Sequence, residues 1–234
     1  HGHYVAVLGD ITDQKRAEQE LRYLANYDTL TSLPNRALLS ERLSRAIVKA
    51  RRGNTRIAML FLDLDRFKDI NDSLGHAAGD RILRAAAHRL QHAVGPTHTV
   101  ARLGGDEFTV LLENLESIEH AEQVARDVLA SFEAPLDIDQ RHDVVISPSI
   151  GISLYPDHAT VPTDLLKHAD TAMYQAKAAG RRTFMRYTEA MDVEIRGRAT
   201  ISAALRGVLD RNELRLVFQP KLSLDHSRIT GVEA

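Results

Sequence analysis

The sequence predicts a mixed α+β domain with a central, mainly antiparallel sheet flanked by helices. Between Asp28 and Tyr187, segments with helical spacing of apolar residues alternate with short apolar runs typical of strands. The run Ile57 to Leu62 is apolar without a break, as expected for a central strand buried on both faces. Two short strands, 98–102 and 108–112, are separated only by a glycine-containing loop, which indicates a hairpin and hence an antiparallel pair.

The composition excludes several classes of protein. The 234 residues are 44% hydrophobic and 26% charged, as in an ordinary globular domain. A formal net charge of -2, few aromatic residues and no Trp give no basis for bulk nucleic-acid binding. The absence of Cys excludes disulfides, thiolate metal sites and a cysteine nucleophile. With no apolar run of about 18 residues and no signal-peptide pattern at the start, we expect a soluble, cytoplasmic fragment without membrane contact.

In the N-terminal part, the sequence pattern predicts a short strand at Tyr4 to Leu8, followed by a polar helix over 14–27. Ala17, Leu21 and Leu24 of this helix form an apolar stripe of less than two heptads. Such a short stripe is marginal alone, so the helix either docks on its own domain or pairs with a second helix in signalling.

The remaining elements follow from spacing and from stop signals. Apolar residues three or four positions apart predict helices over 38–50, 82–94, 118–132 and 165–176. Strands are predicted at 57–62, 98–102, 108–112, 144–154 (interrupted by Pro148) and 183–187. Gly53 and Gly180 follow the first and last of these helices, which is typical helix C-terminal chemistry. Beyond Tyr187, we expect a charged helical stretch over 189–212, a strand at Leu214–Phe218, and the start of another strand at Gly231–Ala234.

Asp63-Leu64-Asp65 stands at the end of the most buried predicted strand. Side chains at i and i+2 of a strand share a face, so both carboxylates project together. Such a pair is costly to bury unless a cation or a proton lies between them, and a hard divalent ion with phosphate oxygens is a natural partner. The alternative is a turn or a cap for a helix beginning near Arg66.

Gly104-Gly105-Asp106-Glu107 forms the predicted hairpin turn. Adjacent glycines permit positive φ and a close approach of the backbone to a ligand, although the same residues also make a good turn with no further role. If this hairpin neighbours the strand that ends at Asp63, three or four carboxylates converge on one edge. That arrangement serves metal-assisted phosphoryl or nucleotidyl transfer.

Two further groups could bind a nucleotide. Asn71 and Asp80 could together read the edge of a purine, or could be turn chemistry with a helix cap at Asp80. Lys177 and Arg181 lie one helical turn apart and could grip phosphates, or could simply complement a helix C-terminus. The eleven histidines show no metal-ligand spacing, and no catalytic triad or phosphate-binding loop motif is present.

Four segments together resemble the GGDEF family of diguanylate cyclases, in order and at the expected spacing, over about Tyr27 to Tyr187. They are Asp28-Thr29-Leu30-Thr31-Ser32-Leu33-Pro34-Asn35-Arg36, Asp63 to Asp72 with Gly75-His76 and Gly79-Asp80, Arg102 to Phe108, and Ala176 to Arg181. The flanks resemble other signalling domains: Asp10 to Asp13 the exit of a PAS sensor domain, and Phe218-Gln219-Pro220-Lys221 with Glu233-Ala234 the opening of an EAL phosphodiesterase domain. The implied division is a PAS-like end (1–13), a linker helix (14–27), the cyclase domain (28–187), an inter-domain helix (188–212) and a truncated EAL-like start (213–234).

The resemblance implies a palm-like sheet related to nucleotidyl cyclases, one GTP per subunit, and a head-to-head homodimer that makes cyclic di-GMP. Mg²⁺ (or Mn²⁺) would be held by Asp63, the Leu64 carbonyl and Asp106, with Glu107 assisting. Asp106 would also be the base for the attacking hydroxyl. Guanine would be read by Asn71 and Asp80, and phosphates would be bound by the backbone at Phe67 and by Lys68, Lys177 and Arg181.

Some positions depart from the family pattern. The family's inhibitory product site is an Arg-x-x-Asp placed five residues before the glycine pair, where this chain has Gly95-Pro96-Thr97-His98, so we expect no product inhibition there. Arg182 stands where the family often has Asn. The EAL-like start lacks nearly all downstream catalytic residues, so we expect no hydrolysis of cyclic di-GMP.

Two other functions compete with an active cyclase. The domain could be a GTP-binding regulatory module with little turnover, acting through 189–212 on a following phosphodiesterase. It could instead be a different nucleotidyl cyclase, which the guanine-reading residues Asn71 and Asp80 disfavour.

Overall fold

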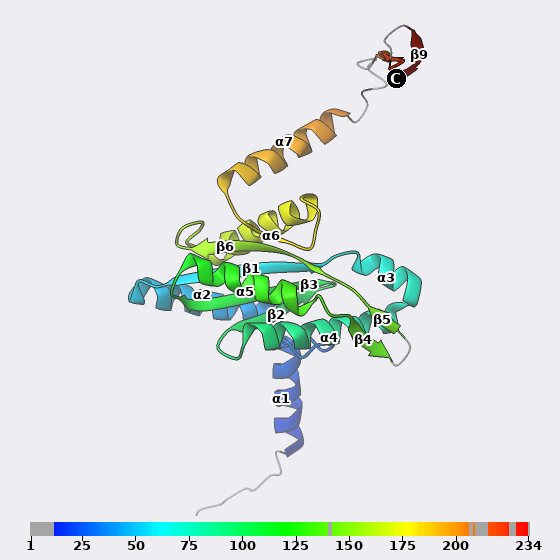
Figure 1. Cartoon of the computed structure of the whole chain (residues 1–234). Helices are drawn as coiled ribbons and strands as arrows, with labels where there is room; N and C mark the ends of the chain where they lie inside the picture. The colour runs from blue at the N-terminus through cyan, green and yellow to red at the C-terminus, as the bar shows by residue number, and fades with distance from the viewer. Residues whose placement is uncertain (1–11, 140–141, 206–207, 209–214, 225–227, 234) are drawn as a thin grey trace, which may run out of the picture. The chain divides into compact units, whose positions relative to one another are not determined.

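The structure of the chain is a computed structural model that describes residues 12–139, 142–205, 208, 215–224 and 228–233 (Figure 1). In chain order its elements are α1 (Thr12–Asn26), α2 (Arg36–Gly53), β1 (Arg56–Leu64), α3 (Phe67–Leu74), α4 (His76–Val94), β2 (Thr99–Gly104), β3 (Glu107–Leu115), α5 (Ile118–Ser131), β4 (Leu136–Asp139), β5 (His142–Val144), β6 (Pro148–Tyr155), α6 (Pro162–Ala178), β7 (Phe184–Arg186), α7 (Glu189–Leu205), β8 (Gln219–Leu222) and β9 (Ile229–Glu233). The predicted α+β class is confirmed.

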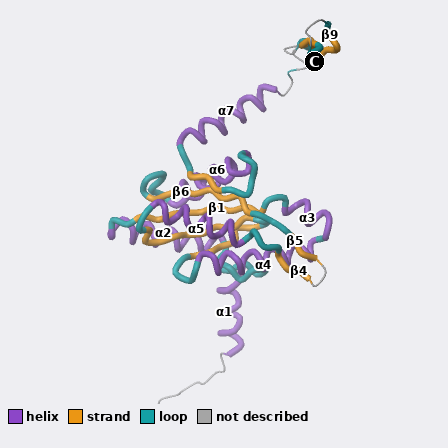
Figure 2. Tube along the Cα trace, viewed as in Figure 1, coloured by secondary structure: helices purple, strands orange, loops and turns teal. Residues whose placement is uncertain are grey.

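A five-stranded sheet with the order β2-β3-β1-β6-β7 forms the centre of the main domain. All of its strand pairs are antiparallel except β6 with β7, which is parallel. Figure 2 shows these strands as a layer between helices. Strand β1 lies in the middle, which explains why eight of its nine residues are buried.

Each face of the sheet packs against its own helices. The even residues of β1, from Ala58 to Leu64, belong to a core with α4 and α5, whereas Ile57, Met59 and Phe61 belong to a second core with α2 and α6. The two-residue period of a strand makes this division. Asp63 continues the odd series, so its side chain lies on the face that α6 covers.

The connection between α1 and α2 is tied down at both ends. Asn35 caps α2, since its Oδ1 accepts hydrogen bonds from the backbone N–H groups of Ala37 (3.0 Å) and Leu38 (3.1 Å). The Nδ2 of Asn35 donates to the Ala25 carbonyl (2.9 Å), and its backbone N–H donates to the Asn26 carbonyl (2.9 Å). The end of α1 is thereby fastened to the start of α2.

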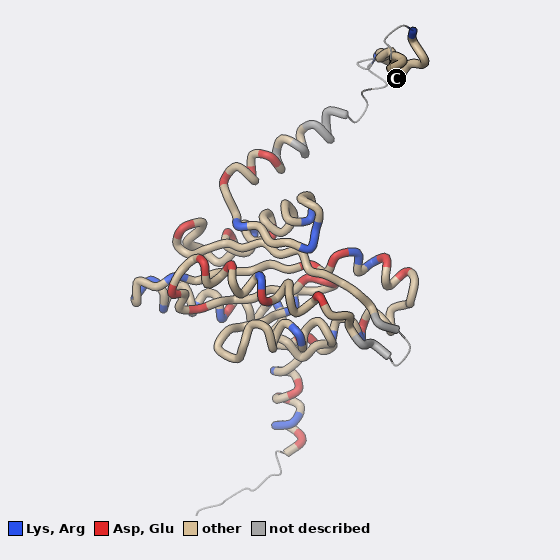
Figure 3. Tube along the Cα trace, in the orientation of Figure 1, with Lys and Arg blue, Asp and Glu red and all other residues tan. Residues whose placement is uncertain are grey.

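The helix predicted over 14–27 is present as α1, but its apolar stripe does not dock on the main domain. No residue of α1 is buried, and Leu21 and Leu24 are 68% and 49% exposed. Residues of both charge signs lie along it (Figure 3). Its apolar stripe is not covered by the described residues, and pairing with a second helix stays a prediction.

Three details of the prediction need correction. The strand expected at 144–154 begins at Pro148, because Val144 belongs to the unpredicted β4–β5 hairpin. The strand expected at Leu214–Phe218 is wrong for the described residues 215–218, which are irregular; the strand is Gln219–Leu222, which pairs with β9. Asp80 is not a helix cap, because α4 begins at His76.

The chain divides into two compact units, His1–Met191 and Asp192–Ala234. The second contains most of α7 and the β8–β9 hairpin, whose pairs include Gln219 with Glu233 and Pro220 with Val232. The predicted strand at Tyr4–Leu8 and the segment that resembles a PAS exit, up to residue 11, lie outside the described residues. Among the helices that are described, none has the length and apolar character needed to cross a membrane.

Candidate active site

The acidic ends of β1 and β3 meet, as the sequence predicts for neighbouring strands. The antiparallel register pairs Asp63 with Glu107, and the Leu64 backbone N–H donates to the Asp106 carbonyl (3.4 Å). The turn between β2 and β3 requires its glycines, because Gly104 (φ 146°) and Gly105 (φ 52°) both adopt positive φ. This turn places Asp106 and Glu107 beside the end of the central strand.

Lys177, in the last turn of α6, forms an ion pair with Asp63, with 2.7 Å between Nζ and Oδ1. Both residues lie on the sheet face that α6 covers, which is why residues so distant in sequence meet. Their side chains are only 28% and 12% exposed. Lys177 is therefore a counterion for Asp63 within the site.

The pKa values of two carboxyl groups in the site, Asp63 and Glu107, are raised. Burial raises the pKa of Asp63, and the nearby Asp106 and Asp65 add to this effect, while Lys177 opposes it. Burial also raises the pKa of Glu107, with added repulsion from Asp170, Asp63 and Asp106, and Arg36 opposes that shift at 4.0 Å. Several acidic groups thus repel one another in a partly dehydrated place.

Such mutual repulsion fits a divalent cation, which would relieve it. Asp63, Asp106, Glu107 and the Leu64 carbonyl are oxygen donors of the type that Mg²⁺ prefers. Within the described residues, no group of three or more potential metal-ligating side chains lies close enough to hold an ion. Lys177 is paired with Oδ1 of Asp63 in this structure, so an ion bound through that oxygen would compete with the lysine.

Asp65 has a structural role rather than the paired role expected from its spacing with Asp63. Its carboxylate accepts hydrogen bonds from Ser147 Oγ (2.8 Å), Ser149 Oγ (2.7 Å) and the Arg182 backbone N–H (3.2 Å). These donors satisfy the buried carboxylate. Asp65 therefore fastens the turn that carries Arg181 to the end of β1, and Arg182 contributes through its backbone.

Asn71 and Asp80, the predicted guanine readers, lie on consecutive helices, α3 and α4. Asn71 Oδ1 is buried and has no hydrogen-bond partner in the structure. A Cβ at Gly79 would lie 1.9 Å from this oxygen, so only glycine leaves room for the amide. A buried, unpaired acceptor is costly, and a ligand that donates a hydrogen bond would satisfy it.

Of the predicted phosphate binders, Phe67 and Lys68 begin α3, where the first backbone N–H groups have no partner within the helix. Phe67 is buried, whereas the Lys68 side chain is exposed. Arg181 follows α6 with φ 65° and lines a groove of about 650 Å³ that also contains Asp65 and Arg66. Lys177 forms its ion pair with Asp63, whereas Arg181 lines this groove, and their joint binding of phosphates stays a prediction.

Arg102 is a residue that the sequence analysis assigned no role. Its Nη1 donates to both carboxylate oxygens of Asp28 (2.9 and 3.0 Å), while Nε and Nη2 donate to the Gly105 carbonyl (3.1 and 2.7 Å). The guanidinium thus joins the segment after α1 to the turn that carries Asp106. Because Asp28 and Arg102 are 74 positions apart, no local spacing could have revealed the pair.

A three-layer α+β domain with carboxylates converging at the ends of two neighbouring strands is the kind of scaffold that metal-assisted phosphoryl transfer uses. The family model "Diguanylate cyclase, GGDEF domain" matches residues 25–183. The chain belongs to this family.

Curated relatives and solved structures agree with this assignment. The chain is 42% identical over 223 residues to MucR of Pseudomonas aeruginosa, which is named a bifunctional diguanylate cyclase/cyclic di-GMP phosphodiesterase. This match covers 95% of this chain and 32% of MucR. It is 48% identical over 171 residues to the diguanylate cyclase TpbB of the same species, with 72% of this chain and 39% of TpbB covered. It therefore spans about a third of the length of the curated relatives it matches. The solved GGDEF domain of TpbB superposes with a TM-score of 0.71 at 45% identity, over 73% of this chain and 99% of that one.

Proposed function

We propose that this chain is a diguanylate cyclase that condenses two GTP molecules into cyclic di-GMP and two pyrophosphates. The observation that carries the proposal is the junction of β1 and β3, where Asp63, Asp106 and Glu107 lie within mutual electrostatic reach beside Lys177. Family membership and the names of MucR and TpbB support the same reaction.

In the proposed site, Asp63, the Leu64 carbonyl, Asp106 and Glu107 would hold Mg²⁺ or Mn²⁺. The ion would polarise the α-phosphate and offset the charge that develops in the transition state. The raised pKa values of Asp63 and Glu107 are consistent with carboxyl groups whose ionised form a bound cation would stabilise.

The substrate would lie across the ends of β1 and α3. Asn71 and Asp80 would bind the guanine edge, and Asn71 Oδ1, which has no partner in the structure, would accept a hydrogen bond from it. The α3 N-terminus at Phe67 and Lys68 would bind phosphate oxygens, because its first N–H groups have no acceptor within the helix. Lys177 would exchange Asp63 for the terminal phosphates, which Arg181 would also contact.

The chemistry is a nucleophilic substitution at phosphorus. The 3′-oxygen of one GTP attacks the α-phosphorus of the other, the bond from that phosphorus to the bridging oxygen breaks, and pyrophosphate leaves. Asp106 takes the proton of the 3′-hydroxyl. The same step with the roles exchanged closes the ring. Since each half-site supplies one nucleotide, the reaction requires two domains face to face, and therefore a homodimer.

The flanking segments would belong to a longer signalling protein. Residues 1–13 would be the end of a PAS-like domain, 14–27 a linker helix, 28–187 the cyclase domain, 188–212 an inter-domain helix, and 213–234 the start of an EAL-like domain. The bifunctional name of MucR, which matches 95% of this chain, supports such a tandem arrangement.

A second candidate function is a GTP-binding regulatory module with little turnover. It is favoured by the match to PdeR of Escherichia coli, named a cyclic di-GMP phosphodiesterase, which is 37% identical over 214 residues, 92% of this chain and 32% of PdeR. The Lys177–Asp63 ion pair is compatible with this alternative, because it offsets the charge of Asp63 without an ion.

Incubation of the chain with GTP and Mg²⁺ over a range of protein concentrations tests the proposal. We expect cyclic di-GMP and pyrophosphate, measured by chromatography, to rise more steeply than linearly with protein concentration, because two half-sites must meet. Saturable GTP binding with no product at any concentration would contradict the cyclase and support the regulatory module.

Asp106→Asn tests the assignment of the ion ligand and the base. We expect its rate to fall by at least about 100-fold, because both the transition-state charge and the proton acceptor are lost. Circular dichroism should show an unchanged fold. Asp164→Asn, at an exposed position in the first turn of α6, is the matched control and should retain full activity. Parental turnover in Asp106→Asn would remove Asp106 from the mechanism.

A further inference from the structure

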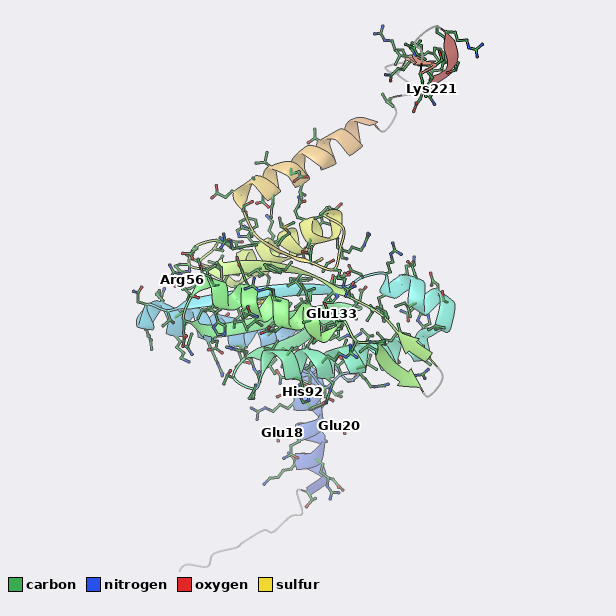
Figure 4. All side chains as sticks on the ribbon, viewed as in Figure 1. Glu18, Glu20, Arg56, His92, Glu133 and Lys221 are labelled. Carbon is green, nitrogen blue, oxygen red and sulfur yellow. The ribbon has the colours of Figure 1, made fainter. Side chains whose placement is uncertain are left out.

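A pair of histidines lies on the exposed side of α4, away from the acidic site. The expectation that no histidines have metal-ligand spacing is wrong for one pair: His88 and His92 occupy positions i and i+4, so they are neighbours on one helix face. Their Nε2 atoms are 3.1 Å apart, and both side chains are exposed to solvent. Figure 4 labels His92 on this helix. The Nε2 atoms of His88 and His92 therefore lie side by side at the solvent-exposed surface of α4.

The separation of these nitrogens matches a chelate. Two imidazole ligands at about 2.0 to 2.1 Å from a tetrahedral ion have nitrogens about 3.3 Å apart. We propose that His88 and His92 form a second metal site, which binds a divalent late transition ion such as Zn²⁺ through both Nε2 atoms. The proposal does not depend on the proposed cyclase activity.

The surroundings leave room for an ion and its other ligands. Both histidines line a pocket of about 510 Å³ between α4, the start of β2 and the turn that follows α1. His98 lines the same pocket, and burial together with His120 lowers its pKa, which favours the uncharged ring that does not repel a cation. Arg42 is the charged group that faces the pocket, and its Nη1 donates to Thr99 Oγ1 (3.1 Å).

The donor atoms determine which ions can bind. Neutral imidazole suits Zn²⁺, Cu²⁺ and Ni²⁺, whereas Mg²⁺ prefers carboxylate, carbonyl and water oxygens. Two protein ligands leave the remaining positions of a four-coordinate ion to water or to a small anion, which the positive charge of Arg42 favours. The site is therefore chemically distinct from the acidic site at β1 and β3, and should select a different ion.

Zinc titration followed by calorimetry tests the site. The parent protein should carry His1→Ala and His3→Ala and no affinity tag, because those imidazoles would also bind zinc. We expect one Zn²⁺ per chain, and an affinity at least about tenfold weaker in His88→Ala and in His92→Gln. Glutamine at position 92 can still form a hydrogen bond with His88, so this variant separates ion binding from a histidine–histidine contact. His76→Ala, at an exposed position at the start of the same helix, should bind zinc as the parent does.

Two results would overturn the proposal. One is a parent protein with no saturable zinc binding, and the other is equal zinc affinity in the parent and in both His88→Ala and His92→Gln. A parallel titration with Mg²⁺ at the same concentrations should show no effect of either substitution, and an equal loss of Mg²⁺ binding would place His88 and His92 in a nonspecific electrostatic role instead.

Discussion

Arg102 shows how one side chain connects the entry to the domain with its candidate site. Its side chain is 9% exposed, and its guanidinium makes four hydrogen bonds, two to the Asp28 carboxylate and two to the Gly105 carbonyl. Arg102→Ala leaves the Asp28 carboxylate without its partner and frees the turn, and we expect a loss of about 3 kcal/mol in the free energy of unfolding, measured with urea. Arg51→Ala, an exposed surface substitution in the last turn of α2, serves as the control. An unchanged unfolding free energy in Arg102→Ala would show that the pair contributes nothing net.

The same pair predicts a pH dependence of stability. Burial alone would raise the pKa of Asp28, but hydrogen bonds from Thr31 and Arg102 outweigh it and lower the pKa below the ordinary value of 3.8. A carboxyl group with a lowered pKa in the folded state stabilises the fold above its unfolded pKa, and this contribution is lost as the pH falls through the folded value.

Comparison of the parent with Asp28→Asn isolates this contribution. We expect the difference in unfolding free energy between the two proteins to be constant near pH 7 and to shrink as the pH falls below about 4. The comparison must be made as a difference, because the raised pKa values of Asp63 and Glu107 act in the opposite direction and are common to both proteins. A difference that is independent of pH would contradict the lowered pKa.

Asp80 is expected to determine base preference. In Asp80→Ala the acceptor for the guanine amino and ring N–H groups would be missing, so we expect the ratio of kcat/KM for GTP over ATP to fall by about tenfold or more. Asp72→Ala, at an exposed position on α3, is the matched control. An unchanged preference in Asp80→Ala would argue against a guanine-reading role.

At the scale of elements, the approach of α6 to β6 depends on one glycine. A Cβ at Gly151 would lie 2.0 Å from the Ala169 carbonyl oxygen and 2.1 Å from the Met173 N atom, both rigid helix backbone. We expect Gly151→Ala to destabilise the domain by about 3 kcal/mol or more, because neither element can yield without disturbing a core. Gly197→Ala, where an added Cβ meets nothing, should be neutral or stabilising in the same thermal or urea measurement.

The elements that the sequence predicted well are those with a strong local pattern. The uninterrupted apolar run of β1 and the glycine turn of the β2–β3 hairpin carry their own signals, and both were confirmed. The β4–β5 hairpin was missed because its strands are very short. Leu216, Val217 and Phe218 have strand propensity but no strand to pair with among the described residues, so propensity alone gave a wrong position.

At the scale of the whole molecule, the sequence could predict that the acidic ends of two strands meet, because a hairpin and a central strand restrict the possible neighbours. It could not predict which cation would balance Asp63, since Lys177 reaches it only through the packing of α6 on the odd face of β1. Nor could it assign Asp65 to Ser149 of β6 and to Ser147 just before that strand, because spacing alone makes Asp63 and Asp65 equivalent.

The position of β1 also bears on how the chain folds. Both of its neighbours come later in the chain, β3 at 107–115 and β6 at 148–155. During synthesis, a nascent chain that ends before Pro148 would leave one edge of an apolar central strand unpaired, and such edges invite association between chains. Because these pairings are distant in sequence, we expect the sheet to close late and slowly, and chains truncated before β6 to aggregate rather than fold.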